Sequence, residues 1–416
     1  MQLTIEKLVY GGSGLARTNQ GVIFVPRSAR GDVVDVEITE QKKDYGLGRI
    51  TRVSVPSPDR RETTCPNYNT AGCCHWDHIQ YERQLEYKEC IIRESLNRIG
   101  HVPWDNPIAR IPSPERAYRL RAVFHIVGNR LGFIQEHTSR VVPIKECTAL
   151  APLLNAFISV CPVFSALNQV HVVTTAAPGN VENALSVTYV FSGELAGTTS
   201  WERVRDTTFE VNEISALTIR MGQNRLHFER QAPIIEVGPY KYQLSSETFF
   251  QTNRFLLEPF IREVLDQAGP SPAHVLELFC GSGFFSIPLA RRCGHVIGVE
   301  ASPIAVKYAR KNARLNQVPN IEFVPQSVEK LLETVTKLQA DLVVLNPPRA
   351  GTGAKTVGRI AALKPAALVY ISCNPATFAR EAGTLSKSGY RLKRLTMVDQ
   401  FPNTYHIEMV ARFELE

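Results

Sequence analysis

Two short stretches near the C-terminal end of the chain, "VLNPPRAG" (residues 344–351) and "YISCNPATFARE" (residues 370–381), decide the fold. The apolar run from Leu368 to Ser372 is typical of a buried strand, and Asn374-Pro375 is typical of the turn that ends one. Cys373 is therefore expected at the C-terminal tip of a strand, the edge where open α/β sheets bind their ligands. The alternative is an incidental small apolar residue.

Short apolar runs alternate with helical stretches throughout the part of the chain after about residue 250. Strand–helix alternation predicts a doubly wound, Rossmann-like parallel sheet over residues 246–416, which makes this an α/β protein. The last two runs are expected to pair as a hairpin-like edge of that sheet. The five runs predicted to be parallel strands and the two of the hairpin are "HVLELF", "HVIGVE", "IEFVP", "DLVVLN" and "ALVYIS", then "YRLKRLTMVD" and "HIEMVARFEL".

The first 245 residues have a different pattern. Short alternating stretches with glycine turns over residues 1–55 predict a small OB-like β-barrel. Residues 56–245 begin with a linker rich in Pro, Ser and charge, continue through a cysteine cluster into the helical stretch "YERQLEYKECIIRESLNRIG", and then become strand-like again. This second region is expected to form a central, mostly antiparallel β domain.

The composition is that of a globular protein with more than one domain. The chain has 416 residues, 44% hydrophobic and 21% charged, and that length predicts two or three domains. No apolar run approaches the ~20 residues needed to span a bilayer, and no signal-peptide core follows Met1, so we expect a cytoplasmic protein with no membrane partner. The net charge of +7 mildly favours a polyanionic partner.

Nine cysteines are spread unevenly along the chain, and an odd, uneven set argues against a disulfide framework. Three of them fall within the ten residues "CPNYNTAGCC" (residues 65–74). This cluster indicates a metal or iron–sulfur site.

A cofactor site is predicted where "ELFCGSGFF" follows the first strand of the α/β region. Gly281 and Gly283 let the backbone approach a ligand closely, and Glu300 ends the next strand, where an acid accepts ribose hydroxyls. Phe284 and Phe285 would crowd a pyrophosphate, so an adenosine without bridging phosphates fits better than a dinucleotide. S-adenosylmethionine is the candidate, and the alternative is a purely structural turn.

Three groups at the same sheet edge could carry out a methyl transfer. The two prolines after Asn346 fix the backbone at one strand tip, Cys373 follows at the next, and Glu408 begins the last strand. A thiolate that adds to C6 of a pyrimidine makes C5 nucleophilic, and a carboxylate base can then remove the C5 proton after methylation. The alternatives are a simple strand terminator at Asn346 and a solvated Glu408.

Together these residues resemble a known family, the S-adenosylmethionine-dependent RNA uracil-5 methyltransferases. The similarity extends to the first 55 residues, which resemble the TRAM RNA-binding barrel, and to "CCHWDHIQYERQLEYK", which is similar to the iron–sulfur segment of ribosomal members. The motifs that carry the resemblance in the α/β region are "SETFFQTN", "LELFCGSGFFSIPLA", "VIGVEASPIAVKYARKNARLN", "LNPPRAG", "YISCNPATFARE" and "DQFPNTYHIEMV".

The resemblance implies a role for each matching residue. Cys373 would be the nucleophile and Glu408 the base. Gln251, Phe279, Glu300 and Asn346 would contact S-adenosylmethionine, with Gln251 and Asn346 also facing the uracil. The implied ligands of a 4Fe-4S cluster are Cys65, Cys73, Cys74 and Cys147.

The sequence departs from the family at two places. Asn346 stands where the family usually has aspartate, and Asn-Pro-Pro is also the motif with which amine methyltransferases hold a target NH₂. In the cysteine segment, Ala71 takes the place of the middle cysteine, which gives the spacing Cys-x7-Cys-Cys. Zinc, with His75 or His78 as a ligand, and no metal at all therefore remain alternatives to the cluster.

RNA is the expected partner. A base in folded RNA must leave its stack before a thiol can reach C6, and phosphate contacts and stacking over the two accessory domains would supply the binding energy. Basic residues in "QKKDYGLGRITR" and "NRLGFIQEHTSR" could bind phosphates. We expect a monomer that methylates a 23S ribosomal RNA uridine. The alternatives are C5 methylation of transfer-RNA uridine 54, an amine methyltransferase and a non-catalytic RNA-binding factor.

Overall fold

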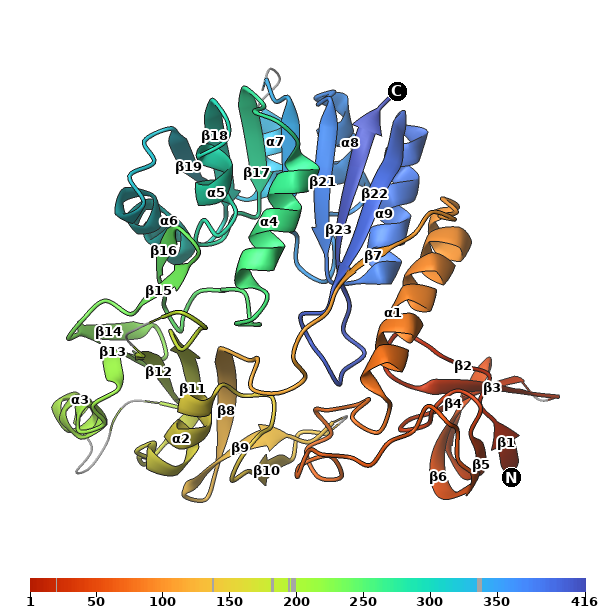
Figure 1. Cartoon of the computed structure of the whole chain (residues 1–416). Helices are drawn as coiled ribbons and strands as arrows, with labels where there is room; N and C mark the ends of the chain where they lie inside the picture. The colour runs from red at the N-terminus through yellow and green to blue at the C-terminus, as the bar shows by residue number, and fades with distance from the viewer. Residues whose placement is uncertain (20, 137, 181–182, 194, 196–199, 335–338) are drawn as a thin grey trace.

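The computed structural model describes the chain except residues 20, 137, 181–182, 194, 196–199 and 335–338. Three sheets and one separate hairpin make up the β structure of the described residues. In Figure 1 the large C-terminal sheet lies at the top, and its lower edge faces the central sheet and the small N-terminal sheet. Among the described residues, no helix combines the length and apolarity that crossing a bilayer requires.

The C-terminal sheet is doubly wound, as the strand–helix alternation predicts. Its strands follow the order β19-β18-β17-β20-β21-β23-β22-β7, and the first five are parallel. Their apolar runs are buried because helices cover both faces. The parallel strands are β17 (His274–Leu278), β18 (His295–Glu300), β19 (Ile321–Pro325), β20 (Leu342–Leu345) and β21 (Ala367–Ser372).

The helices that cover this sheet belong to two apolar cores, one on each face. One core contains residues of α4 (Leu257–Ala268), α5 (Ser286–Ala290) and α6 (Pro303–Leu315). The other contains residues of α7, α8 and α9 together with α1, which belongs to the region before the sheet. These four helices are α1 (Tyr81–Ser95), α7 (Val328–Thr334), α8 (Ala354–Ala362) and α9 (Pro375–Lys387).

The end of the sheet differs in one respect from the expected edge hairpin. β22 (Tyr390–Val398) and β23 (Glu408–Leu415) pair antiparallel, as predicted. However, β23 lies between β21 and β22, and β7 (Ala109–Ile111) pairs with the outer side of β22. The hairpin is therefore internal, because a strand from the preceding region covers its free hydrogen-bonding groups.

The helical stretch that was predicted after the cysteine cluster ends on glycine, as expected. Helix α1 continues into a π-helical turn, η1 (Leu96–Gly100). A Cβ at Gly100 would lie 2.4 Å from the Ala379 carbonyl oxygen, and one at Gly383 would lie 2.5 Å from the Gly100 carbonyl oxygen. Only glycine permits this close approach, which fixes η1 against α9.

The N-terminal region forms a six-stranded sheet around its own small core, in agreement with the barrel expectation. The strand order is β1-β5-β6-β4-β3-β2. Seven buried apolar residues, from Leu3 to Val36, fill its interior. The strands are β1 (Gln2–Thr4), β2 (Lys7–Leu8), β3 (Gly14–Thr18), β4 (Gly21–Val25), β5 (Val33–Gln41) and β6 (Tyr45–Val55).

The central sheet has seven strands and is mostly antiparallel, as predicted, with one parallel pair, β12–β13. Helices α2 (Pro152–Val160) and α3 (Trp201–Phe209) contribute to its core. The separate hairpin joins β15 (Ile234–Val237) to β16 (Tyr240–Gln243). The strands of the central sheet are β8 (Arg121–Val127), β9 (Arg130–Ile134), β10 (Val141–Pro143), β11 (Leu167–Thr174), β12 (Leu185–Phe191), β13 (Ile214–Met221) and β14 (Asn224–Glu229).

Candidate active site

The strand tips named from the sequence meet at one edge of the C-terminal sheet. Because β17, β18, β20 and β21 are parallel and adjacent, the residues after them share that edge. Those residues are Phe279, Glu300 at the end of β18, Asn346 and Cys373. Glu408 reaches the same edge from the opposite direction, because β23 is antiparallel and Ser372 pairs with Met409. The ladder thus brings the first residue of β23 beside the residue that follows β21.

The Cys373 thiol lies in an electrostatic environment formed by Glu408 and Arg349. Burial and, to a smaller extent, the charge of Glu408 raise the pKa of Cys373 to about 11, although Arg349 opposes them through its charge and a hydrogen bond. Burial also raises the pKa of Glu408 to about 8, against a smaller opposing effect of Arg349. The resting site therefore holds protons on both groups, and Arg349 is the cation that favours their ionisation.

The loop that leads into Glu408, residues 399–407, is anchored to the region around the cysteine cluster. Asp399 forms a fully buried ion pair with Lys88 of α1 (Nζ–Oδ1 2.6 Å) and accepts a hydrogen bond from Tyr81. Asn403 adopts a left-handed conformation (φ 63°), and its carbonyl oxygen accepts a hydrogen bond from the Trp76 amide. Residues before α1 and within it thereby fix the position of the loop that leads into Glu408.

A second anchor, Glu381, holds the loop after Asn346, and sequence reasoning missed its role. Glu381 is buried on α9, and its carboxylate accepts hydrogen bonds from the amides of Thr352 and Gly353 (each 2.8 Å) and from the hydroxyl of Tyr370 (2.5 Å). The Asn374 side chain donates to the Arg349 carbonyl oxygen (3.1 Å), which ties this loop to the Cys373 turn. The available signal was an acid among the residues that this helix buries, most of which are apolar.

The glycine turn after β17 has the geometry of a nucleoside site. The Gly281 amide and the Ser302 amide donate to the Glu300 carboxylate (3.1 and 2.7 Å), which fixes this acid beside the turn. Phe279, Gly281 and Gly283 all have positive φ (63°, 56° and 84°). A Cβ at Gly281 would meet no atom within 4 Å, so the turn leaves room for a ligand. These features fit the adenosine part of S-adenosylmethionine.

The segment that contains Gln251 crosses from the central sheet to the C-terminal sheet. Ser246 is hydrogen-bonded to Thr188 of β12 (2.8 Å), and the Asn253 amide donates to Gln400 in the loop before Glu408 (3.3 Å). Gln251, between them, is buried, whereas Phe249 is 59% exposed. The segment therefore runs from the central sheet to the loop that leads into Glu408.

The cysteine cluster predicted from the sequence is assembled from two parts of the chain. The Sγ atoms of Cys65, Cys73 and Cys74 lie within 4.8 Å of one another, and Cys73 is hydrogen-bonded to Cys147, which follows β10. Hydrogen bonds with Cys73 and Cys74 lower the pKa of Cys65 to about 3, whereas hydrogen bonds with the neighbouring thiols and, secondarily, burial raise the pKa of Cys73. Four convergent thiols form a donor set that fits a 4Fe-4S cluster.

Of the two histidines considered as zinc ligands, His78 is fully engaged elsewhere, whereas Nδ1 of His75 is buried and has no hydrogen-bond partner among the described residues. Both ring nitrogens of His78 have partners, the Tyr68 hydroxyl (2.8 Å) and the Ser28 carbonyl oxygen (3.2 Å), and burial lowers its pKa to about 4. His75 Nε2 lies 3.3 Å from Glu136 Oε1, and its ring packs against Tyr405. The contacts of His78 argue against it as a metal ligand.

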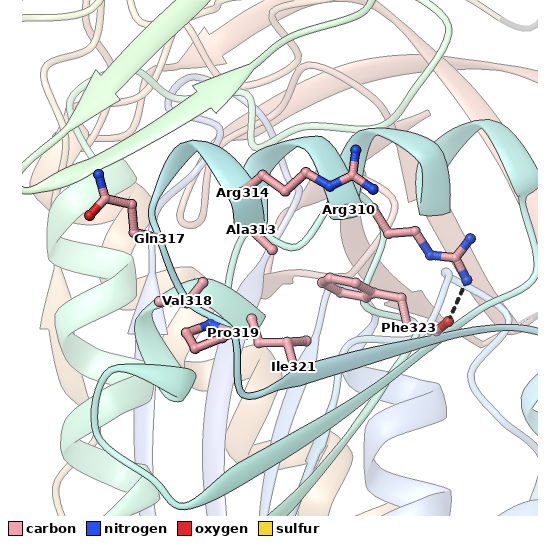
Figure 2. A pocket seen from close by; sticks show the side chains of 8 residues that line it. All are labelled: Arg310, Ala313, Arg314, Gln317, Val318, Pro319, Ile321 and Phe323. Atoms are coloured by element: carbon pink, nitrogen blue, oxygen red, sulfur yellow. Dashed lines mark hydrogen bonds between the residues drawn. The ribbon is translucent and has the colours of Figure 1, made fainter.

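A cavity of about 460 Å³ lies between α6 and β19, away from the strand tips. Figure 2 shows Arg310 and Arg314 along its upper side and Phe323 and Ile321 below, with Arg310 donating to the Phe323 carbonyl oxygen (2.9 Å). Ile321 begins β19, whereas Glu300 pairs with the last residue of that strand. The cavity therefore extends toward the end of the sheet opposite the glycine turn.

Two models of known protein families match this chain. A family model described as tRNA (Uracil-5-)-methyltransferase matches residues 197–413, more than half of the chain, and the TRAM domain model matches residues 1–51. The chain belongs to the tRNA (uracil-5-)-methyltransferase family. Members of this family are S-adenosylmethionine-dependent RNA methyltransferases that act at C5 of uracil, and this protein is an enzyme of that class.

Individual members of the uracil-5-methyltransferase family match over the full length. The chain is 36% identical to an uncharacterized RNA methyltransferase of Aquifex aeolicus, covering 100% of this chain and 99% of the relative. It is 31% identical to the 23S rRNA (uracil(1939)-C(5))-methyltransferase RlmD of Shewanella sediminis, covering 100% and 96%. The crystal structure of Pyrococcus abyssi tRNA (uracil-54, C5)-methyltransferase with S-adenosyl-L-homocysteine superimposes with a TM-score of 0.76 at 25% identity, covering 99% and 100%.

The charges around the thiol of this methyltransferase predict its reactivity. Alkylation of Cys373 by iodoacetamide should rise with pH toward a midpoint near 11, above the ordinary cysteine value of about 8.5. Glu408→Gln removes a charge that raises the pKa, so its midpoint should be lower, and Arg349→Gln should have the opposite effect. The measurement is mass spectrometry of the Cys373 peptide between about pH 7 and 12, with the alkylation rates of the variants compared at each pH. Cys90, exposed on α1, is the internal control, although burial raises its pKa as well. A Cys373 midpoint near the ordinary value of about 8.5 would contradict the assigned environment.

Proposed function

We propose that this enzyme methylates C5 of a uridine in 23S ribosomal RNA through a covalent bond between Cys373 and C6 of the base. The observation that carries the proposal is the meeting of Cys373 and Glu408 at the strand tips that also hold Asn346 and the glycine turn. S-adenosylmethionine, when bound, supplies an electrophilic methyl group. The chain's own residues then have to hold the base, add to it and remove one proton.

Cys373 and Glu408 have separate roles in the proposed reaction. Cys373, as thiolate, adds to C6 and makes C5 nucleophilic, and Glu408 removes the C5 proton after methylation so that the C6–sulfur bond can break and release Cys373. Arg349 favours the thiolate through its charge and hydrogen bond. A Glu408 pKa raised to about 8 makes the carboxylate a stronger base than an ordinary glutamate.

Six residues are proposed to hold the cofactor. Glu300 would accept the ribose hydroxyls, and the Phe279-to-Gly283 turn would leave space for the nucleoside. Gln251 and Asn346 would face both the cofactor and the uracil. Asn346 can donate and accept hydrogen bonds, so it can hold a uracil edge without adding a negative charge beside Glu408. The proposed cofactor residues are Gln251, Phe279, Gly281, Gly283, Glu300 and Asn346.

We assign the three sequence regions to three tasks. Residues 1–55 form the TRAM barrel, residues 56–245 the central domain with the cysteine cluster, and residues 246–416 the methyltransferase domain. The full-length similarity to RlmD enzymes favours ribosomal RNA. The structural similarity to the Pyrococcus transfer-RNA enzyme makes transfer RNA the second candidate. We further propose that the protein acts in the cytoplasm as a monomer.

The central sheet offers a polar face for the RNA. Cross-strand partners share a face, and the register places Val123, His171, Thr188, Thr218 and His227 in one row across five strands. The neighbouring row contains His125, Gln169, Val190, Arg220 and Arg225. The opposite face carries the apolar core beneath α2 and α3.

This polar face leads toward the active site. Ser246 and Thr248, which precede Gln251, are hydrogen-bonded to Thr188 and to Arg121 on this same face. The Arg121 guanidinium also lies 5.7 Å from the centre of the exposed Phe249 ring. Cationic and aromatic groups side by side suit single-stranded RNA, because phosphates pair with arginine and bases stack on rings.

Arg220→Ala tests this RNA surface, because Arg220 is exposed on the proposed face. Loss of one phosphate contact should weaken RNA binding about three- to tenfold and reduce the slope of log K against log salt by about 1. The rate at saturating RNA should stay unchanged. Arg205→Ala is the matched control, because Arg205 lies on α3 beneath the opposite face. Equal RNA affinities of the two variants would show that this face does not bind the RNA.

Fluorinated RNA tests the covalent step and the choice of RNA together. Fluorine at C5 cannot leave as a proton, so with S-adenosylmethionine the adduct should remain on Cys373 and survive a denaturing gel. Cys373→Ser should form none, and Glu408→Gln should accumulate the adduct even with ordinary uridine. Cys293→Ser, in the same domain, is the control. We expect the adduct with 23S fragments rather than transfer-RNA transcripts. Methylation by Cys373→Ser would instead support an amine methyltransferase.

We propose that Cys65, Cys73, Cys74 and Cys147 hold a 4Fe-4S cluster, which would join the segment before α1 to the end of β10 and provide a one-electron redox centre. Anaerobically purified protein should contain iron and absorb visible light, and Cys65→Ser should lose both. Cys161→Ser, half-buried in the same region but outside the cluster, should keep them. A colourless protein that contains zinc in place of iron would overturn the assignment.

A further inference from the structure

A tyrosine of the N-terminal sheet reaches the residue that carries the nucleophile. Tyr10 lies in the turn between β2 and β3, and its hydroxyl donates a hydrogen bond to the carbonyl oxygen of Cys373 (3.2 Å), 363 residues away in sequence. Its ring meets the Tyr405 ring edge to face (5.6 Å, 87°). One side chain therefore contacts both the Cys373 turn and the loop that leads into Glu408.

The turn that carries Tyr10 is closely fitted to its surroundings. The Gly12 carbonyl oxygen accepts a hydrogen bond from the Trp76 indole nitrogen (3.0 Å). Gly12 has a φ of +92°, and a Cβ there would lie 2.8 Å from Cδ1 of Tyr405. Only glycine satisfies both the backbone and the contact, so the position of this turn is specified by the packing around it.

The Tyr10 hydroxyl also remains a donor at every physiological pH. Burial raises its pKa to about 12, and the nearby charge of Cys373 acts in the same direction. Cys373 itself lies between two regular elements, because Ser372 is the last residue of β21 paired with β23 and Asn374 caps helix α9. A hydrogen bond to the Cys373 carbonyl oxygen restrains the peptide that joins the strand to the helix.

We propose that Tyr10 is a positioning residue for the nucleophile, so that the N-terminal sheet helps to build the active site as well as to bind RNA. The inference rests on the proposed function, because the step that benefits is the addition of Cys373 to C6. Fixing the 373–374 peptide limits the directions in which the thiol can point. Small displacements of a nucleophile lower its reaction rate strongly, since the attack requires a near-attack geometry.

Tyr10→Phe tests this, because it removes the hydroxyl and keeps the ring against Tyr405. We expect adduct formation with saturating 5-fluorouracil RNA to slow about three- to tenfold, the range of one net hydrogen bond. Alkylation of Cys373 in the RNA-free enzyme should also change, which a purely structural role would not cause. RNA affinity should stay within error, and the thermal midpoint should fall by no more than a few degrees, about the effect of one lost hydrogen bond. Tyr45→Phe, in the same sheet and packed on Phe24, is the matched control.

The outcomes separate this inference from the proposed function. If the wild-type enzyme forms no adduct with any of the RNAs, the proposed function fails. If it forms the adduct and Tyr10→Phe does so at the same rate, the positioning role is overturned. Weaker RNA binding with an unchanged rate at saturation overturns it as well, in favour of a direct RNA contact. Gly12→Ala should slow the reaction in the same direction, and an effect in Gly12→Ala alone would assign the role to the turn rather than the hydroxyl.

Discussion

The active site depends on the antiparallel pairing of β23 with β21. Parallel strands place only their last residues at the edge that holds Cys373, whereas an antiparallel neighbour places its first residue there. Six residue pairs, from Ala367–Glu414 to Ser372–Met409, fix this register. A slip of one residue would turn every side chain of β23 to the opposite face, and Glu408 would no longer lie beside Cys373. The encounter of thiol and carboxylate is thus a consequence of sheet topology more than of local sequence.

Regions outside the C-terminal domain also hold the loop that leads into Glu408. The loop before Glu408 is held by a fully buried ion pair between Lys88 and Asp399, and α1, which carries Lys88, packs on α9 through the glycines of η1 and α9. An ion pair of this kind is costly to break, about 3–5 kcal/mol, because the remaining charge stays buried. The cysteine segment contacts the same loop through Trp76, and the N-terminal sheet reaches it through Tyr10. Three regions distant in sequence therefore set the geometry around Cys373 and Glu408, the two proposed catalytic groups.

The sequence predicted those features that depend on local pattern. Runs of apolar residues that end at Asn346 or before Cys373 identify strand tips, because proline and asparagine end a strand whatever surrounds it. It did not predict β7, since three residues without a pattern become a strand only when β22 offers an edge. The roles of Glu381 and Tyr10 were missed for the same reason, as each depends on partners supplied by the fold. His78 was a plausible ligand by residue type alone, and its two hydrogen bonds argue against that use.

The raised pKa of Glu408 lowers the stability of the folded protein as the pH rises. The folded protein holds the Glu408 proton with a pKa of about 8, well above the ordinary 4.5, so folded chains bind more protons than unfolded ones between these values. Stability must therefore fall as the pH rises from about 4.5 to 8, by roughly 3 kcal/mol at pH 7. Arg349 offsets part of this cost, but it lies exposed at the rim, where water screens its charge. A base that enters the site and excludes this water would strengthen the effect of Arg349 on both groups. Excluding water also increases the desolvation that raises both pKa values, so ionisation in the occupied site requires that the gain from Arg349 exceed this opposing effect.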